Sequence, residues 1–301
     1  MMGLGNLIKR NIKLFFKDKG MFFTSLITPV ILLVLYATFL ANVYRDSFVS
    51  NIPEMIKIGD SVIDATVGGQ LVSSLLAVSC VTVAFCSNLL MVQDKISGAR
   101  RDIAVTPVRR STVAVAYFCA SAITTMIISL TALGVCLLYL LKTGWYLSAA
   151  DVLYTVLDVV LLTLFGVALS SCINYPLSTN GQGSAVGTIV SAGYGFICGA
   201  YMPISSFGSG LQKVLSFLPS TYMTSLVRNH AMRGALAQME ADGVPKAFVD
   251  ATRESLDCTV AFAGKTVTIP AMYAYVGGII LILLGAYLAV QYLAERKRIH
   301  S

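Results

Sequence analysis

Asp158 is the residue whose chemistry stands out first, because 54 uncharged residues, Val159 to Gln212, follow it directly. If this stretch crosses a membrane, its carboxyl group is costly to bury, and such groups commonly bind a cation or carry a proton. The structural alternative is a carboxyl group near the outer interface that is protonated or hydrogen-bonded to a neighbouring helix. No lysine or arginine partner is visible inside the predicted spans, so both interpretations stay open.

A second chemical feature is a short basic island between two long uncharged runs. Its charged residues are Asp94, Lys95, Arg100, Arg101, Asp102, Arg109 and Arg110. A basic loop between two membrane spans is expected on the cytoplasmic side. Residues 95–105 can form a helix that Pro107 would stop, and a cytoplasmic partner could push on such a helix. The alternative is a solvated basic loop that only sets the topology.

The composition places both features in a membrane protein. Of the 301 residues, 56% are hydrophobic and only 12% are charged, whereas roughly 25% charged residues is usual in a soluble domain. The net charge of +7 comes largely from basic residues that flank apolar runs, which favours membrane orientation over nucleic-acid binding. Six of the seven cysteines lie in apolar runs and are expected to be small buried hydrophobes.

Enzyme motifs are absent from the sequence. The stretch AGKT at Ala263 to Thr266 is similar to the end of a phosphate-binding loop, but Thr259 stands where the first glycine would fall. There is no Gly-x-Ser-x-Gly, no His-Glu-x-x-His and no cysteine pair with metal-ligand spacing. We therefore expect a chain that is not an enzyme and has no catalytic residue, cofactor or metal of its own.

The hydrophobic runs predict one all-α transmembrane domain over residues 1–301 with six spans. An N-terminal interfacial helix at 1–19 is expected because Lys9, Lys13 and Lys17 share one face opposite an apolar stripe. The predicted spans are 20–44, 65–93, 111–141, 150–173, 183–202 and 266–294, with a cytoplasmic loop at 94–110. Residues 203–265 are expected to form a re-entrant helical hairpin, broken by Pro203 and Pro219, and an extracellular cap.

Charge asymmetry predicts the orientation. With both termini in the cytoplasm, the inside segments carry 13 lysines and arginines and the two short outside loops carry 3. The excess on the inside agrees with the positive-inside rule, for which short loops are the informative ones.

The predicted fifth span carries a small residue at every fourth position. These residues are Gly183, Gly187, Ser191, Gly195 and Gly199. Small residues let helix backbones approach closely in lipid, so the stripe predicts tight packing on another helix, within the chain or across a dimer axis. The alternative is that the stripe lines a substrate path.

Two segments resemble the permease subunits of the type-2 ABC exporter family, which share their fold with the human G-subfamily. The first is DKISGARRDIAVTPVRRST, in which Asp94, Gly98, Thr106, Pro107, Arg109 and Arg110 match the family's first cytoplasmic loop. The second is CGAYMPISSFGSGLQKVLSFLPSTYMTSLVRN, in which Gly199, Pro203, Leu211, Pro219, Tyr222 and Arg228 match the end of the fifth span and the re-entrant hairpin. Together with the six-span plan, the resemblance covers essentially the whole chain.

The resemblance implies a permease that works with a separate cytoplasmic ATPase, which would hold the ATP and Mg, and with a second permease copy or paralogue. It implies a multi-pass protein of a bacterial plasma membrane. The ATPase-coupling residues expected from it are Lys95, Gly98, Arg100, Arg101, Asp102 and Pro107. The substrate path is expected to include Phe85, Asn88, Asp158, Thr188 and Tyr194, between the second and fifth spans. The hairpin residues expected to matter are Pro203, Pro219, Tyr222 and Arg228.

Three classes of function remain in competition. The first is ATP-driven export of an amphipathic molecule such as a drug, an antimicrobial peptide or a lipid, with polysaccharide or lipid-linked glycan export as a variant. The second is a secondary transporter coupled to an ion through Asp158, for which an internal repeat would be expected and none is found. The third is a membrane sensor or scaffold that uses residues 231–265 as its ligand-binding part.

Overall fold

The computed structural model describes residues 2–262 and 265–299, with side chains for 3–262 and 265–293. These residues are almost entirely helical, and the one sheet among them is a hairpin of two-residue strands, β1 (Ala261–Phe262) and β2 (Lys265–Thr266). The prediction of an all-α membrane protein is confirmed. Residues 294–301 lie outside the described side chains, and so does part of the AGKT stretch.

The helices follow one another in the order that the hydrophobic runs predict. They are α1 (Met2–Lys17), α2 (Lys19–Leu35), the π-helix η1 (Tyr36–Leu40), α3 (Ala41–Ser50), α4 (Asp60–Asn88), α5 (Leu90–Ile96), α6 (Ala99–Ala104), α7 (Arg110–Thr143), α8 (Ala149–Asn174), α9 (Asn180–Ile197), the 3₁₀ helix η2 (Ile204–Ser206), α10 (Ser209–Leu215), α11 (Pro219–Ala241), α12 (Lys246–Ser255) and α13 (Ile269–Ile299).

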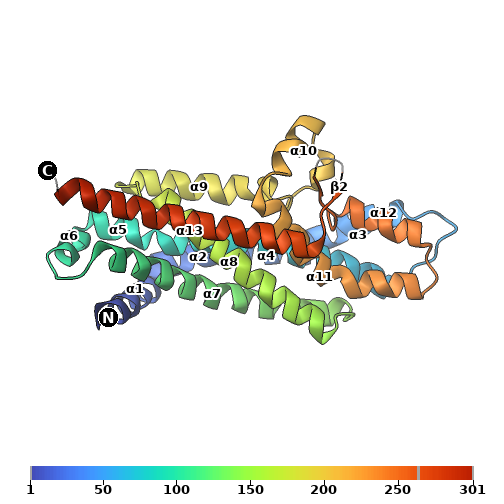
Figure 1. The fold of residues 1–301 in the computed structure, drawn as a ribbon. Coiled ribbons are helices and arrows are strands. Elements are labelled where there is room, and N and C mark those ends of the chain that lie inside the picture. Colours follow the sequence, from blue (N-terminus) through green and yellow to red (C-terminus); the bar gives the residue numbers. More distant parts are fainter. Residues whose placement is uncertain (1, 263–264, 300–301) are drawn as a thin grey trace.

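Five helical stretches within the described residues are long and apolar enough to cross a membrane. They are Lys19–Ser50, Asp60–Ile96, Arg110–Thr143, Ala149–Asn174 and Ile269–Leu293. The fifth predicted span corresponds to α9, which has 18 residues, is not among these five and runs lengthwise beside α4 and α5 (Figure 1).

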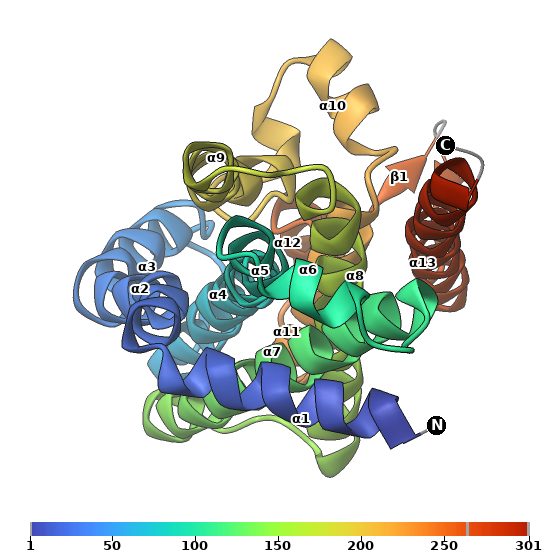
Figure 2. The same ribbon diagram turned by 90° about the vertical axis from the view of Figure 1, so that its left-hand side faces the viewer.

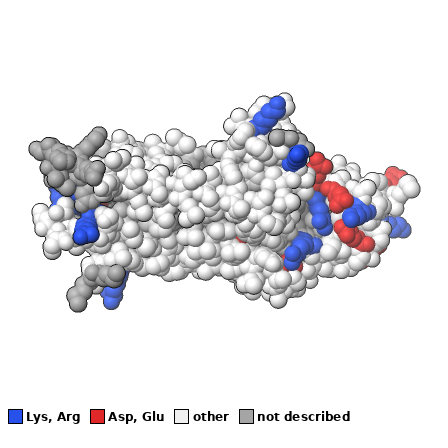
Figure 3. All heavy atoms as spheres, in the orientation of Figure 1, with Lys and Arg blue, Asp and Glu red and all other residues white. Residues whose placement is uncertain are grey.

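The molecule has two different ends (Figure 1). The basic end holds α1, α6 and the last turns of α13, and the cap end holds α3, α12 and the C-terminal half of α11. Lysines and arginines appear alone at the basic end, both signs of charge appear at the cap end, and the face between them is nearly uncharged (Figure 3). An uncharged belt between two charged ends is the surface pattern that a lipid bilayer requires.

The α4–α5 column, Asp60–Ile96, lies at the centre of the bundle (Figure 2). It packs against α2, α7, α8, α9 and α11, and nearly all of its α4 side chains are buried. Small residues permit this crowding: a Cβ on Gly69 would lie 2.7 Å from the Ala231 carbonyl oxygen, and one on Gly166 would lie 3.1 Å from the Val81 Cα. Small residues therefore let α8 and α11 approach α4 closely.

Cap-end packing depends on a separate apolar cluster. Val62 at the start of α4 meets Met232, Leu236 and Met239 of α11 and Val249 of α12 in that cluster. α11 is a single helix to Ala241, so it runs without a break past position 231, where the predicted cap begins. The apolar face of α11 continues past that position and has no reason to break there.

Two further helix boundaries differ from the prediction. The helix predicted at 95–105 is divided between α5 and α6, because Gly98 has a φ of 84°, in the left-handed region that interrupts a right-handed helix. The last turn of the predicted fifth span is not helical either. α9 ends at Ile197, and Gly199, with a φ of 73°, turns the chain toward Pro203.

Candidate functional site

An ion-pair cluster at the basic end joins α1 to the α4–α5 column. The Arg10 guanidinium donates two hydrogen bonds to the Asp94 carboxylate, at 2.6 and 3.0 Å. Tyr117 of α7 donates a third to Asp94 Oδ2 at 2.5 Å. We call Arg10, Asp94 and Tyr117 the Asp94 cluster. Since three helices meet on one carboxylate, a displacement of α1 acts directly on the end of the column.

The loop beyond this cluster is held by the turn between α8 and α9. Lys95 Nζ donates to the backbone carbonyls of Tyr175 and Leu177, the latter at 2.8 Å. Arg100 lies over the Tyr175 ring, 5.4 Å from its centroid. Of the expected coupling residues, Lys95 and Arg100 thus anchor the loop to the protein, whereas Arg101, Asp102 and Pro107 are exposed and available to a partner.

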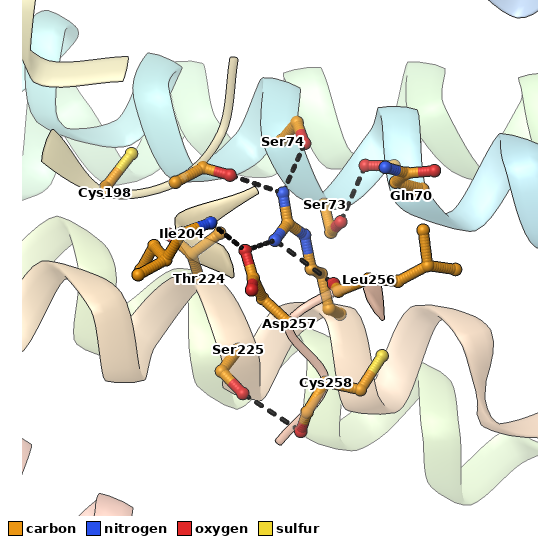
Figure 4. Close-up of polar contacts among 12 residues, drawn as sticks. Gln70, Ser73, Ser74, Cys198, Ile204, Thr224, Ser225, Leu256, Asp257 and Cys258 are labelled. Atoms are coloured by element: carbon orange, nitrogen blue, oxygen red, sulfur yellow. Dashed lines mark hydrogen bonds and ion pairs between the residues drawn. The ribbon is translucent and has the colours of Figure 1, made fainter. Parts of the chain in front are cut away.

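A second cluster, near the cap end, is built on a buried arginine (Figure 4). Arg228 of α11 pairs with Asp257 at 3.1 Å and donates to the carbonyls of Gly199 and Leu256 at 2.6 and 3.2 Å. It also donates to Ser74 Oγ of α4 at 3.2 Å. We call these five residues the Arg228 cluster. It fixes α11, the end of α9 and the segment before β1 to the α4–α5 column.

Asp257 supplies the negative charge that pairs with Arg228 in this cluster. Its carboxylate also accepts a hydrogen bond from the Ile204 backbone N–H at 2.7 Å, which holds the chain just after Pro203. Burial raises the pKa of the Asp257 carboxyl, and the Arg228 charge opposes that shift. Ser74 and Asp94 are twenty residues apart on one column, a rise of about 30 Å, which is the thickness of a bilayer core.

Asp158 is fully paired in the structure. Its Oδ2 lies 2.6 Å from His230 Nδ1 of α11, and its Oδ1 accepts a hydrogen bond from the Tyr273 hydroxyl of α13 at 2.6 Å. Tyr154 stacks on the His230 ring with centroids 5.0 Å apart. These are the neighbouring-helix partners that the structural interpretation of Asp158 requires, and they join α8, α11 and α13. The functional interpretation stays a prediction.

The residues expected along the substrate path differ in burial and in hydrogen-bond partners. Phe85 and Asn88 are buried on α4, where the Asn88 amide donates to Ser170 and Ser171 of α8 at 3.0 and 2.8 Å. Thr188 is exposed on α9. Tyr194 is buried, and its hydroxyl has no hydrogen-bond partner among the described residues. Their role in a path stays a prediction.

The small residues of α9 do not form a single contact face within the chain. Positions four apart on a helix advance by about 40° each time, so the four that lie on α9 span roughly 120° of its circumference. Gly183 faces Leu89, and Gly195 faces the Tyr201 ring. A Cβ on Gly187 would meet nothing within 4 Å, and Ser191 is exposed. Packing of the open part against a second copy stays a prediction.

The hairpin residues lie at the turns around α10. Pro219 is the first residue of α11, where its missing N–H removes no helix hydrogen bond. The Tyr222 hydroxyl donates to the Ser216 carbonyl at 2.7 Å and closes the turn before α11. Pro203 precedes η2. Sequence reasoning picked out Arg228 in this region but not Asp257, and it missed Arg10, His230 and Tyr273, whose partners are far away in the chain.

The fold and these clusters define a multi-pass helical membrane protein with an exposed basic loop at one end. The family model described as ABC-2 type transporter matches residues 3–231, and the chain belongs to that family. No curated protein matches the chain. The match includes the Asp94 cluster and the basic loop, and it ends just after Arg228.

Proposed function

We propose that this chain is the permease subunit of an ATP-driven exporter for an amphipathic molecule. Membrane domains of this family are transport components that generally work with an ATPase partner. The observation that carries the proposal is the α4–α5 column, which has the Asp94 cluster at one end and meets the Arg228 cluster about 30 Å away. A push on α1 or α6 would reach the column at Asp94.

The proposed orientation places the basic end in the cytoplasm, where the exposed Arg101 and Asp102 would face the ATPase. We propose six crossings, the five long apolar stretches and α9, and the path of the chain supports this number. α8 ends at the basic end, α13 begins toward the cap end, and α9 runs between these levels (Figure 1). The α9 face left open in one chain would meet a second permease copy or paralogue.

An amphipathic substrate is supported by a cleft of about 510 Å³ at the cap end. It lies among α3, α4 and α12, and its walls mix aromatic side chains, such as Tyr44 and Phe248, with polar ones such as Gln70. A molecule with an apolar body and a few polar groups suits such walls. Within the proposed path, this cleft would be passed on exit.

The proposal is tested with the chain and its ATPase in lipid vesicles. We expect co-purification of the two and transport that vanadate inhibits. Arg101→Glu should remove most of the stimulation of ATP hydrolysis by the permease, whereas Lys142→Glu, at the far end of α7, should leave it unchanged. Full stimulation in the Arg101 variant would contradict the coupling role of the loop.

Ion-coupled transport is the second candidate, and the paired Asp158 is the observation in its favour. A buried carboxylate beside His230 and Tyr273 can exchange a proton with its neighbours. Asp158→Asn retains the size of the side chain and removes its charge. The second candidate would be excluded if Asp158→Asn transports at the wild-type rate and if transport by both the variant and the wild type is insensitive to the proton gradient.

A further inference from the structure

A cleft of about 550 Å³ opens at the basic end behind α6. Four cationic side chains line it: Lys95, Arg100, Arg101 and Arg110. Among the described residues, no carboxylate lines the cleft and none forms an ion pair with these four. Four like charges around one cavity repel one another, so the arrangement is unfavourable unless an anion binds among them.

The two carboxylates nearest in the sequence, Asp94 and Asp102, do not line the cleft. Asp94 belongs to the Asp94 cluster, where Arg10 and Tyr117 bind its two oxygens. Asp102 is exposed and is not a lining residue. The positive charge of the cleft is therefore not neutralised by the described part of the chain.

Two of the cations are held in place before any ligand arrives. Lys95 is fixed by two backbone carbonyls at the α8–α9 turn, and Arg100 lies over the Tyr175 ring. Lys95, Arg100 and Arg110 are each only partly exposed. Cations that are ordered in advance lose less side-chain entropy when they bind an anion.

The start of α7 adds to the positive character of the rim. Arg110 is the first residue of this 34-residue helix, and the preceding Arg109 forms no side-chain cap. The first N–H groups of a helix lack partners inside it, and the helix dipole favours a negative charge beside them.

Apart from Tyr117, Tyr175 and Gln291, the remaining wall of the cleft is apolar. Val113 and Ala114, in the first turn of α7, line it together with Ile103 and Val108. In the proposed topology this turn is where α7 enters the bilayer, so the cleft lies at the boundary between headgroups and acyl chains. A ligand that fits has an anionic group at one end and a hydrocarbon chain at the other, unlike free phosphate.

We propose that this cleft binds the phosphate headgroup of an anionic phospholipid of the cytoplasmic leaflet, with the start of an acyl chain against α7. Basic pockets between spanning helices on that side are suited to such headgroups. The identity of the leaflet rests on the proposed orientation, but the binding chemistry does not. A bound lipid would relieve the repulsion among the four cations and stiffen the loop that carries α6.

The test uses the purified full-length chain in a neutral detergent with tail-labelled fluorescent phosphatidylglycerol. We expect Arg100→Gln/Arg110→Gln to weaken lipid binding about tenfold, because each cation near an anionic headgroup raises the binding constant several-fold. Arg100→Lys/Arg110→Lys should retain most of the binding, because it keeps both charges. The matched control is Lys57→Gln/Lys246→Gln, which removes the same charge from exposed positions at the cap end and should change binding less than about twofold.

Two competitors separate the possible sources of the phosphate. Labelled phosphatidylcholine should bind much more weakly, and millimolar inorganic phosphate should not displace phosphatidylglycerol. Equal losses in the cleft and control variants, equal binding of the two lipids, or displacement by inorganic phosphate would each overturn the proposal. If the double variant aggregates, Arg110→Gln alone decides, with an expected loss of about threefold. Because no ATPase or transport is needed, the result is independent of the proposed function.

Discussion

The Asp94 cluster and the Arg228 cluster, which both contact the α4–α5 column, differ in their exposure to water. The Arg10 side chain is 32% exposed, whereas the Arg228 side chain is 2% exposed. When the Arg10–Asp94 pair opens, water can replace its hydrogen bonds, but Arg228 has only protein partners. From this difference we predict that the joint at α1 opens more readily than the Arg228 cluster, which we expect to act as a fixed attachment for the cap end.

The largest expected effect comes from breaking the fixed attachment. Arg228→Met leaves the Asp257 carboxylate buried without its charge partner, which should lower the free energy of unfolding by about 3–5 kcal/mol. Thermal unfolding in detergent measures this loss. Arg253→Gln is the control, because its pair with Glu240 is half-exposed at 3.5 Å and should contribute less than about 1 kcal/mol.

The same variant should acquire a dependence of stability on pH. Burial already raises the pKa of Asp257, and loss of Arg228 would raise it further. A group whose pKa is raised on folding contributes most below its unfolded pKa, and the contribution declines as the pH rises through the folded pKa. The unfolding temperature of Arg228→Met should therefore lie closer to that of the wild type at pH 5 than at pH 8. An equal deficit at both values would show that Asp257 is not the group left uncompensated.

A smaller effect is expected at the movable joint. Arg10→Gln removes a half-exposed partner of Asp94 but leaves the hydrogen bond from Tyr117, so it should lower the free energy of unfolding by about 1–2 kcal/mol. Lys9→Gln, at the adjacent exposed position, should have almost no effect. If Arg10→Gln destabilises as much as Arg228→Met, the contrast between the two clusters is wrong.

The smallest expected effect concerns the break between α5 and α6. Gly98→Ala places a Cβ on a residue with a φ of 84°, where the strain is about 1 kcal/mol, although the Cβ would meet no neighbour within 4 Å. Amide hydrogen exchange across 99–104 should become faster by about fivefold, with little change elsewhere. Unchanged exchange would mean that the loop does not depend on the left-handed conformation of residue 98.

The sequence was informative about helices and less so about what joins them. Long apolar runs and flanking charges predicted most of the spanning helices and the basic loop, because these depend on local composition. The pairs Arg10–Asp94 and Asp158–His230 join residues 84 and 72 positions apart, and no local pattern connects them. The helix predicted through Gly98 failed for a different reason, since one glycine conformation outweighed the helical preference of its neighbours.

Burial on α4 shows the same limit. The family resemblance placed Phe85 and Asn88 on a substrate path; the structure buries both, and Asn88 donates to two serines of α8. The position of a helix within the bundle cannot be obtained from its own hydrophobic pattern when it is apolar on all sides. Only the packing reveals that α4 is surrounded.

The most direct test of the account is ATP-driven transport by Asp94→Asn in vesicles that contain the partner ATPase. Asparagine retains a hydrogen-bonding side chain but removes the charge that holds Arg10, so folding and co-purification with the ATPase should persist. The account predicts that transport falls by about tenfold while ATP is still hydrolysed, as expected for a loss near 1.4 kcal/mol in coupling. Transport at the wild-type rate would contradict the claim that α1 acts on the α4–α5 column through Asp94.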